Sequence, residues 1–135
     1  MTYLLDTNAL SEPARRRPSL VFMERLRRQH SELSTSVLCA GEMLYGARRR
    51  PGLARYENYL RAAVVGNMPI LDVDFDVVTR YADLRAETER EGRARADMDL
   101  LIAATALRHG LTLVTRNVRH FADLPGLSVE DWTTS

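Results

Sequence analysis

The sequence predicts an α/β fold, a three-layer α/β/α sandwich built on a mostly parallel sheet. Short apolar runs alternate with longer segments of helical periodicity, which is the pattern of strands joined by crossover helices. The first run, Tyr3–Leu5, is apolar throughout, as expected for a parallel strand that is buried on both faces. At 135 residues, we expect one domain, 1–135, that is large enough to bury a real core.

The elements of the N-terminal half follow from apolar spacing and from capping residues. We expect a strand at 3–5, a helix at about 20–29 with Leu20, Met23 and Leu26 on one face, a short strand at 33–35 and a helix at about 37–48. Ser19 and the serines at 34 and 36 favour helix starts, because a serine hydroxyl accepts a hydrogen bond from the first turn of a helix. Between the first strand and the first of these helices, Ser11-Glu12-Pro13 breaks the chain.

The C-terminal half continues the alternation. We expect a helix at about 53–65, a strand at 69–73, a helix at about 75–91, a helix that begins near Asp97, a strand at 112–115 and an edge strand at 127–129. A breaker, Arg49-Arg50-Pro51-Gly52, separates the helices at 37–48 and 53–65, so these two helices form an αα-hairpin.

The charge of the chain is unevenly distributed. Residues 1–61 hold eleven arginines against six acidic residues, whereas residues 62–135 hold eight arginines against twelve acidic residues. All nineteen basic residues are arginine, for which the codon usage of a GC-rich genome is the main explanation. The physical consequence is independent of that cause, because the guanidinium fork matches phosphate geometry and a basic half suits a polyanion.

Composition also indicates the cellular compartment and whether the chain enters a membrane. Cys39 is the only cysteine, so no disulfide can form within the chain, and the N-terminus lacks the basic and apolar regions of a signal peptide. No apolar run approaches the length of a membrane span. We therefore expect a protein of the cytoplasm that does not enter a membrane.

Acidic and amide side chains are predicted to gather at one edge of the sheet. Asp6 ends the first strand and Asn117 follows the strand at 112–115, and ligands of parallel sheets bind beyond the carboxyl ends of the strands. Glu42 lies in mid-helix among apolar or small neighbours, so it is either buried or at the rim of a cleft. Asp99 shares the apolar face of the helix that begins near Asp97.

Each of these residues also has an ordinary structural explanation. Asp6 with Thr7 and Asn8 can form a turn and a helix cap, and Glu42 can lie at the edge of an amphipathic face with its head in water. Asp97 is the natural N-cap of its helix, and both Asp97 and Asp99 can complement the helix dipole. Only Asp99, because it shares the inward face, is poorly explained in this way.

Several carboxylates at one site repel one another, and a divalent cation removes that repulsion. Hard oxygen ligands suit Mg²⁺ or Mn²⁺, whereas zinc favours histidine or cysteine. His30, His109 and His120 have no ligand-pair spacing and are expected at the surface or in loops. A carboxylate-held metal beside a basic half suggests metal-assisted hydrolysis of phosphodiesters.

The chain resembles the PIN-domain ribonucleases, most closely the VapC-type toxins of bacterial type II toxin–antitoxin pairs. Four segments and the closing Glu130-Asp131-Trp132 carry the resemblance, in order and at family-like spacing: Leu4-Leu5-Asp6-Thr7-Asn8, Glu42-Met43-Leu44-Tyr45-Gly46-Ala47, Asp99-Leu100-Leu101-Ile102-Ala103-Ala104 and Leu113-Val114-Thr115-Arg116-Asn117-Val118-Arg119-His120-Phe121. The opening segment, continued to Ser11-Glu12-Pro13, also looks like the FitB subgroup, toxin relatives whose partner binds DNA.

The resemblance implies roles for particular residues. Asp6, Glu42 and Asp99 match the first three family acids and would hold Mg²⁺, and the motif Asp-x-x-Ile-Ala selects Asp99 over Asp97. The fourth position, aspartate in many PIN domains, is Asn117, which favours one well-bound metal, with a second arriving with RNA. Thr115, and also Thr7 or Asn8, would support the site by hydrogen bonds. Candidates for phosphate contacts are Arg15, Arg16, Arg17, Arg48, Arg49, Arg50 and Arg116.

The resemblance further implies an endoribonuclease that is neutralised by a VapB-like antitoxin and that dimerises. The antitoxin would lie in a groove by the helices at 37–48 and 53–65, and the substrate could be tRNA, rRNA or mRNA. A different class of function remains open, namely a non-catalytic module that acts as corepressor with a DNA-binding antitoxin. A PIN-like flap nuclease acting on DNA is disfavoured, because the chain carries no added DNA-binding region.

Overall fold

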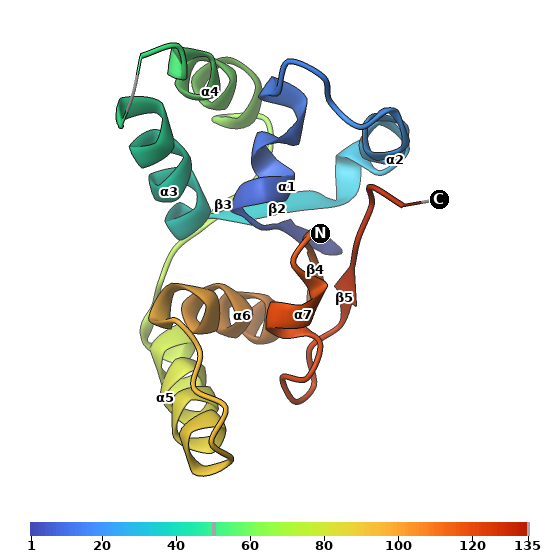
Figure 1. Cartoon of the computed structure of the whole chain (residues 1–135). Coiled ribbons are helices and arrows are strands. Elements are labelled where there is room, and N and C mark those ends of the chain that lie inside the picture. The colour runs from blue at the N-terminus through green and yellow to red at the C-terminus, as the bar shows by residue number, and fades with distance from the viewer. Residues whose placement is uncertain (50, 135) are drawn as a thin grey trace.

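The computed structural model describes residues 1–49 and 51–134, which form a five-stranded sheet with helices on both faces (Figure 1). The strands are β1 (Tyr3–Leu5), β2 (Leu33–Ser36), β3 (Ile70–Leu71), β4 (Thr112–Val114) and β5 (Val129–Glu130). Their order is β3-β2-β1-β4-β5, and every neighbouring pair is parallel. The expected α/β class with a parallel sheet is confirmed.

The helices divide into two groups according to how the sheet is wound. They are α1 (Thr7–Ser11), α2 (Leu20–Arg28), α3 (Val37–Arg48), α4 (Ala54–Tyr59), α5 (Phe75–Arg90), α6 (Asp97–His109) and α7 (Val118–Phe121), with short helical turns η1 (Glu12–Ala14), η2 (His30–Glu32) and η3 (Leu60–Val64). The chain passes from β1 to β2 to β3, then crosses back to β4 on the other side of β1. Since parallel crossovers are right-handed, this reversal places α1, α3 and α4 on one face and α5, α6 and α7 on the other (Figure 1).

Several expected elements agree with the structure in detail. Helix α3 spans the predicted residues, and the Ser36 hydroxyl accepts hydrogen bonds from the main chain of its first turn. Ser19 caps α2 in the same way, through the N–H of Phe22 at 3.1 Å. The αα-hairpin is present, because α3 packs against α4.

Other expectations need correction. The helix predicted at 53–65 is α4 followed by a π-helical turn, η3, and the strand predicted at 69–73 is reduced to Ile70–Leu71. The edge strand predicted at 127–129 is Val129–Glu130, which begins two residues later and ends one residue later. Helices α1 and α7 were not predicted, because each is too short to show helical periodicity.

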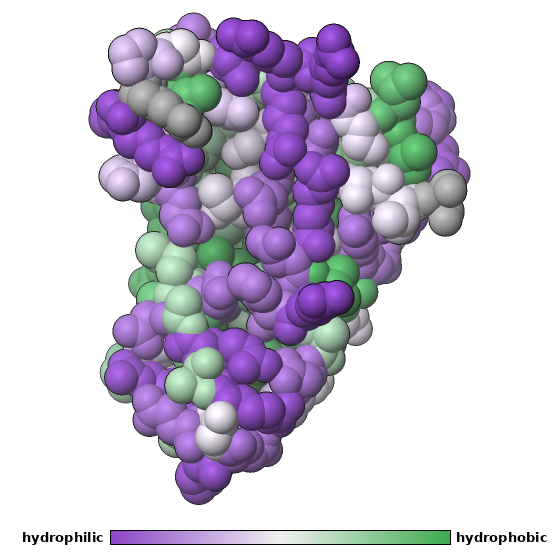
Figure 2. All heavy atoms as spheres, in the orientation of Figure 1, coloured by the Kyte–Doolittle hydropathy of each residue, from purple (hydrophilic) through white to green (hydrophobic). Residues whose placement is uncertain are grey.

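The expected inward face of α2 is also partly wrong. Leu20 is 84% exposed, and Phe22 is the residue of this helix that is buried in the core. Phe22 packs against the ring of Trp132, with centroids 6.0 Å apart. Val21 is exposed as well. Figure 2 shows apolar surface over α2 on a face that is otherwise largely hydrophilic.

Helix α6 is the most deeply buried helix and packs small side chains against the sheet. Ala103, Ala104 and Ala106 are fully buried, as are Leu4 and Leu113 in the neighbouring strands β1 and β4. Alanine side chains allow a helix and a sheet to approach closely. The helix ends at Gly110, whose positive φ of 67° is the left-handed conformation that glycine adopts most readily.

Asp97 is not the cap of α6, contrary to expectation. The capping position belongs to Ala96, which offers no side-chain hydrogen bond, and Asp97 is the first helical residue. The Asp97 carboxylate instead accepts a hydrogen bond from the Tyr81 hydroxyl at 2.8 Å and lies 3.3 Å from Arg85. Asp97 therefore ties α6 to α5, the helix that packs most extensively against it.

No helix in residues 1–49 and 51–134 combines the length and the apolar character that a bilayer span requires.

Candidate active site

The candidate site lies where the direction of winding reverses, between β1 and β4. Strands β1 and β4 are neighbours, and Asp6 and Thr115 directly follow them. At such a point the crossover connections leave toward opposite faces, which opens a crevice at the carboxyl ends of the strands. The first and last expected site segments are therefore brought side by side by the sheet itself.

Asp6 is held at this edge by helix α1. Its Oδ1 accepts a hydrogen bond from the N–H of Ala9 at 2.8 Å, so Asp6 is the N-cap of α1. Its side chain points into the protein, and the residue is only 5% exposed. The expectation of a helix cap and the expectation of a site residue are thus compatible, because the cap fixes the direction of the carboxylate.

The pKa of Asp6 is raised to about 6. Burial is the largest cause and the nearby negative charges of Glu42 and Asp99 act in the same direction, whereas hydrogen bonds from the Thr115 hydroxyl and the Ala9 amide lower the pKa. Within the described residues no arginine, histidine or chain terminus forms an ion pair with Asp6. Asp6, Glu42 and Asp99 are therefore close enough to affect one another electrostatically, and no described cation pairs with Asp6 to neutralise its charge.

Glu42 reaches the site from helix α3 on the face that carries α1. It is half-buried at the rim of a cleft, and its Oε1 accepts a hydrogen bond from the Thr7 hydroxyl. The cleft has a volume of about 380 Å³. Residues of α1, α3 and α4 and of the connections that adjoin these helices line it: Thr7, Asn8, Ser11, Arg15, Glu42, Met43, Tyr45, Gly46, Arg49, Leu53 and Tyr56. The expected position of Glu42 at a cleft rim is confirmed, and Thr7 orients its carboxylate.

Asp99 approaches from the opposite face, in the first turn of α6. Its side chain is 30% exposed, and its Oδ2 lies 3.6 Å from Nδ1 of His120. His120 belongs to the short helix α7 and is exposed, as expected for a histidine of the surface. Its contact with Asp99 was not expected, because nothing in the spacing from 99 to 120 indicates it.

Thr115 and Asn117 complete the edge from the end of β4. Thr115 is buried, and its hydroxyl accepts a hydrogen bond from the N–H of Asn117 at 2.9 Å. Asn117 is exposed. It occupies the N-cap position of helix α7, but its side chain makes no capping hydrogen bond. The structure therefore connects Asn117 to Asp6 through the Thr115 hydroxyl, which contacts both residues.

The acids do not form a closed metal cage. In the described part of the chain, no three His, Cys, Asp or Glu side chains are grouped closely enough to hold one ion together. Such an arrangement fits Mg²⁺, which keeps several waters and is usually bound by one or two carboxylates and by substrate phosphate. The donor chemistry also fits, because Asp6 is a buried carboxylate without a cationic partner among the described residues.

The candidate RNA-binding arginines fall into three groups. Arg48 is occupied, because it contacts Glu57 at 3.2 Å and joins α3 to α4. Arg16, Arg17 and Arg49 are exposed, half-buried Arg15 lines the cleft with Arg49, and Arg116 is exposed beside Thr115 and Asn117. Arg50 lies outside the described residues.

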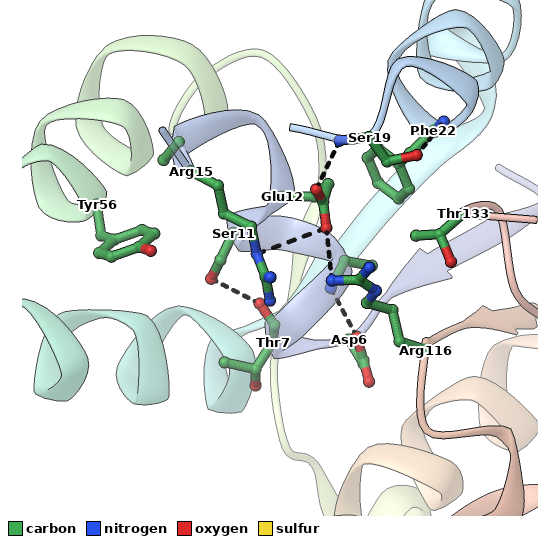
Figure 3. A network of polar contacts seen from close by, with 12 residues as sticks. Asp6, Thr7, Ser11, Glu12, Arg15, Ser19, Phe22, Tyr56, Arg116 and Thr133 are labelled. Atoms are coloured by element: carbon green, nitrogen blue, oxygen red, sulfur yellow. Dashed lines mark hydrogen bonds and ion pairs between the residues drawn. The ribbon is translucent and has the colours of Figure 1, made fainter. Parts of the chain in front are cut away.

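A buried acid that was not among the expected site residues lies close by. Glu12 is 1% exposed, and its Oε1 lies 3.5 Å from Arg15 and 3.4 Å from Arg116 (Figure 3). In the sequence Glu12 stands in a chain-breaking Ser-Glu-Pro segment. In the structure this segment is helical instead, because η1 follows α1 directly, and Glu12 is buried at their junction.

Comparisons with known proteins identify the class. The PIN domain family model matches residues 3–127. A tRNA(fMet)-specific endonuclease VapC from Shigella flexneri is 31% identical over 137 residues, with 98% of this chain and 99% of the relative covered. The chain belongs to the PIN-domain family.

Solved structures narrow this further. The DNA-bound VapBC complex from Salmonella typhimurium contains a chain with a TM-score of 0.88 and 29% identity, covering 98% of each chain. FitAcB from Neisseria gonorrhoeae gives a TM-score of 0.85 at 28% identity, covering 97% of this chain and 98% of the other. Within the PIN-domain family, the chain is one of the VapC ribonucleases, and the resemblance found in its motifs is confirmed.

Proposed function

We propose that this chain is a Mg²⁺-dependent endoribonuclease toxin, with Mn²⁺ as an alternative metal, that hydrolyses RNA phosphodiester bonds and is neutralised by a VapB-like antitoxin. One observation carries the proposal. Asp6 is a buried carboxylate whose pKa is raised to about 6, and it faces Glu42 and Asp99 at the edge where parallel sheets bind ligands.

In this mechanism the carboxylates of Asp6, Glu42 and Asp99 would hold the metal, one or two of them directly and the rest through water. When bound, Mg²⁺ supplies a Lewis acid that activates water and stabilises negative charge on the scissile phosphate. The Thr115 hydroxyl orients the Asp6 carboxylate, and the Thr7 hydroxyl orients that of Glu42. Asn117 offers an amide at the same edge that can position water or substrate, and cleavage leaves 5′-phosphate and 3′-hydroxyl ends.

The substrate that we propose to test first is tRNA. The relative from Shigella flexneri is named for cleavage of tRNA(fMet), and the two chains correspond over almost their whole lengths. Ribosomal RNA and mRNA are the alternatives. Arg15, Arg16, Arg17, Arg49 and Arg116 are the described arginines that are proposed to contact RNA phosphates, because each has guanidinium surface available to solvent.

The proposed antitoxin contact is the cleft between α1, α3 and α4. Glu42 lies at its rim, and its lining combines apolar Met43 and Leu53 with Arg15 and Arg49. Such a mixed cleft suits an extended peptide with both apolar and charged side chains. A segment bound there would cover Glu42 and thereby block the site. We also propose that the toxin forms a homodimer and acts in the cytoplasm.

The test uses the toxin freed of antitoxin, unfractionated tRNA and Mg²⁺. We expect cleavage by the wild-type protein, loss of cleavage in EDTA, and loss in Asp99→Asn, which keeps the shape of the side chain but removes its charge. Glu24→Gln is the matched control, because Glu24 is an exposed acid on α2 that contacts only Arg27 and Arg28 in the described residues. Equal cleavage by the wild type and Asp99→Asn would overturn the mechanism.

The same experiment discriminates the non-catalytic alternative. A corepressor would neither cleave RNA nor bind Mg²⁺ or Mn²⁺, and its expression without antitoxin would not arrest growth. Sequencing the ends of cellular RNA after expression of the toxin would identify which RNA is cut and at which sequence.

A further inference from the structure

We propose that Glu12 is a positioning residue that holds Arg15 and Arg116 on either side of the acidic site, where these two arginines bind the phosphates of an RNA strand. The inference rests on the proposed function, because it assigns the substrate contacts of that same site. It starts from the most deeply buried acidic side chain in the described part of the chain.

Glu12 is placed by the two helical segments around it. It follows α1 and begins η1, and its Oε2 accepts a hydrogen bond from the N–H of Ser19 at 2.9 Å, just before α2. This bond accounts for one carboxylate oxygen. The other oxygen, Oε1, is buried and accepts no hydrogen bond from any described residue. A buried charged oxygen in this state needs compensation from nearby cations.

The compensation comes from two guanidinium groups that reach Oε1 from different parts of the chain. Arg15 contributes its Nε at 3.5 Å from the loop after η1, and Arg116 contributes a terminal nitrogen at 3.4 Å from the end of β4. Figure 3 shows both side chains pointing at the carboxylate of Glu12, each from its own segment of the chain. Glu12 therefore fixes the guanidinium groups of two segments that are far apart in the sequence.

Both arginines border the acidic site. Arg15 lines the cleft that contains Thr7 and Glu42. Arg116 directly follows Thr115, whose hydroxyl contacts Asp6, and directly precedes Asn117. One arginine thus lies on the Glu42 side of the acids, and the other lies on the β4 side.

The arginines keep donors for a ligand. Their side chains are 38% and 40% exposed, and in residues 1–49 and 51–134 Glu12 is the only acid that either one contacts. Each uses one nitrogen toward Glu12, and a guanidinium carries five N–H donors, so several donors remain free toward solvent. Two positive charges against one negative charge leave a net positive patch beside the acids, which suits a phosphate.

Glu12 also keeps the arginines away from the catalytic acids. A free guanidinium next to Asp6, Glu42 and Asp99 would be attracted to their negative charges and would compete with a metal ion. The buried carboxylate supplies a fixed competing partner. It also lowers the conformational entropy that the arginine side chains lose when a phosphate binds.

The test measures affinity for labelled, unfractionated tRNA at several salt concentrations, in an Asp99→Asn background so that the RNA stays intact. In Glu12→Gln the amide oxygen still accepts the hydrogen bond from Ser19, but the charge that orients the arginines is lost. We expect about three- to tenfold weaker binding and a log–log salt slope that is smaller by about 1 to 2. The variant gains one positive charge, so a general electrostatic effect predicts the opposite sign.

Coupling identifies the path of the effect. Arg116→Gln alone should weaken binding similarly, and Glu12→Gln combined with Arg15→Gln and Arg116→Gln should bind no worse than the variant that lacks only the two arginines. Glu24→Gln is the control, because it adds the same charge to an exposed position on α2. Thermal unfolding of every variant reports the folded fraction.

Two results would overturn the inference: Glu12→Gln that binds as tightly as Glu24→Gln, or effects of Glu12 and Arg116 that simply add. If Glu12→Gln does not fold, Arg116→Lys decides, since it keeps the charge but loses the planar fork and should weaken binding. RNA binding without cleavage by the wild type would contradict the proposed function and leave the coupling measurement intact.

Discussion

Two buried carboxylates lie at the two ends of helix α1, and they differ in whether cations neutralise them. Asp6, at the N-terminal end, is 5% exposed, has no ion pair among the described residues and lies near two further acids. Glu12, just beyond the C-terminal end, is 1% exposed and has two arginines at 3.4 and 3.5 Å. The same short segment thus carries one neutralised acid and one acid without a neutralising charge.

The difference indicates which carboxylate serves the structure and which serves the chemistry. An acid that folding alone must accommodate is paired inside the protein, because an unpaired buried charge is costly. An acid left unpaired at a sheet edge, among like charges, has a cost that an external cation can remove. The contrast between Asp6 and Glu12 therefore supports a metal at Asp6, and each prediction below tests one side of it.

The largest expected effect is on catalysis at the unpaired acid. Asp6→Asn keeps an oxygen that can accept the Ala9 hydrogen bond but removes the charge that would hold Mg²⁺. We expect cleavage of tRNA to fall by about 100-fold or more, which corresponds to roughly 3 kcal/mol of lost transition-state stabilisation. Single-turnover rates in Mg²⁺ measure it. Cleavage within a factor of two of the wild-type rate would remove Asp6 from the mechanism.

The next effect is on stability against pH in EDTA. The pKa of Asp6 is raised from 3.8 to about 6, so between these values the folded state keeps a proton that the unfolded state has released. The contribution of protonated Asp6 is therefore complete below pH 3.8, is lost as the pH rises to about 6, and stays lost above it. Two pH units correspond to up to about 3 kcal/mol.

Urea unfolding of the wild type and Asp6→Asn at several pH values measures this effect, and the difference between the two proteins isolates Asp6 from the other titrating groups. We expect Asp6→Asn to be the more stable protein near pH 7. A difference that does not change from pH 4 to pH 7, or that changes in favour of the wild type, would contradict the unpaired state of Asp6.

Glu12 should respond in the opposite direction when its partners are removed. Replacing both Arg15 and Arg116 with glutamine leaves a buried carboxylate without the two cations that contact it. We expect the free energy of unfolding to fall by about 2 kcal/mol, less than for a fully buried pair because both arginines are partly exposed. Adding Glu12→Gln should restore much of it. Urea unfolding at pH 7 measures both steps, and no rescue would show that the charge of Glu12 is compensated elsewhere.

The contrast between these acids also shows what the sequence reveals and what it does not. The positions of Asp6 and Asp99 were predictable, because Asp6 follows an apolar strand and Asp99 lies in the first turn of an apolar helix. Strand β1 and helix α3 were predictable for a related reason, since local pattern and capping agree with the fold.

The features that were missed depend on contacts between distant segments. Asp97 has the local pattern of an N-cap, yet Tyr81 and Arg85 of α5 engage its carboxylate. Glu12 gives no periodic signal, and its burial results from packing between the α1–α2 connection and the end of β4. His120 meets Asp99 only because α7 packs against α6. Such pairings are set by tertiary structure, which a single sequence does not display.

The smallest expected effect compares the response of the two acids to metal. At a Mg²⁺ concentration ten times its dissociation constant, a site that exists only in the folded state adds about 1.4 kcal/mol to the free energy of unfolding. We expect MgCl₂ to raise the thermal unfolding temperature of the wild type and of Glu12→Gln, but not that of Asp6→Asn. NaCl at equal ionic strength is the control. An equal shift in all three proteins would mean that Mg²⁺ stabilises the fold at another place.

No shift in the wild type would mean that the metal enters only with RNA, since one or two carboxylates and a phosphate are the usual ligands of Mg²⁺. In that case Asp6 bears its unpaired charge until the substrate arrives, and repeating the titration with the Asp99→Asn protein and intact tRNA would separate the two possibilities.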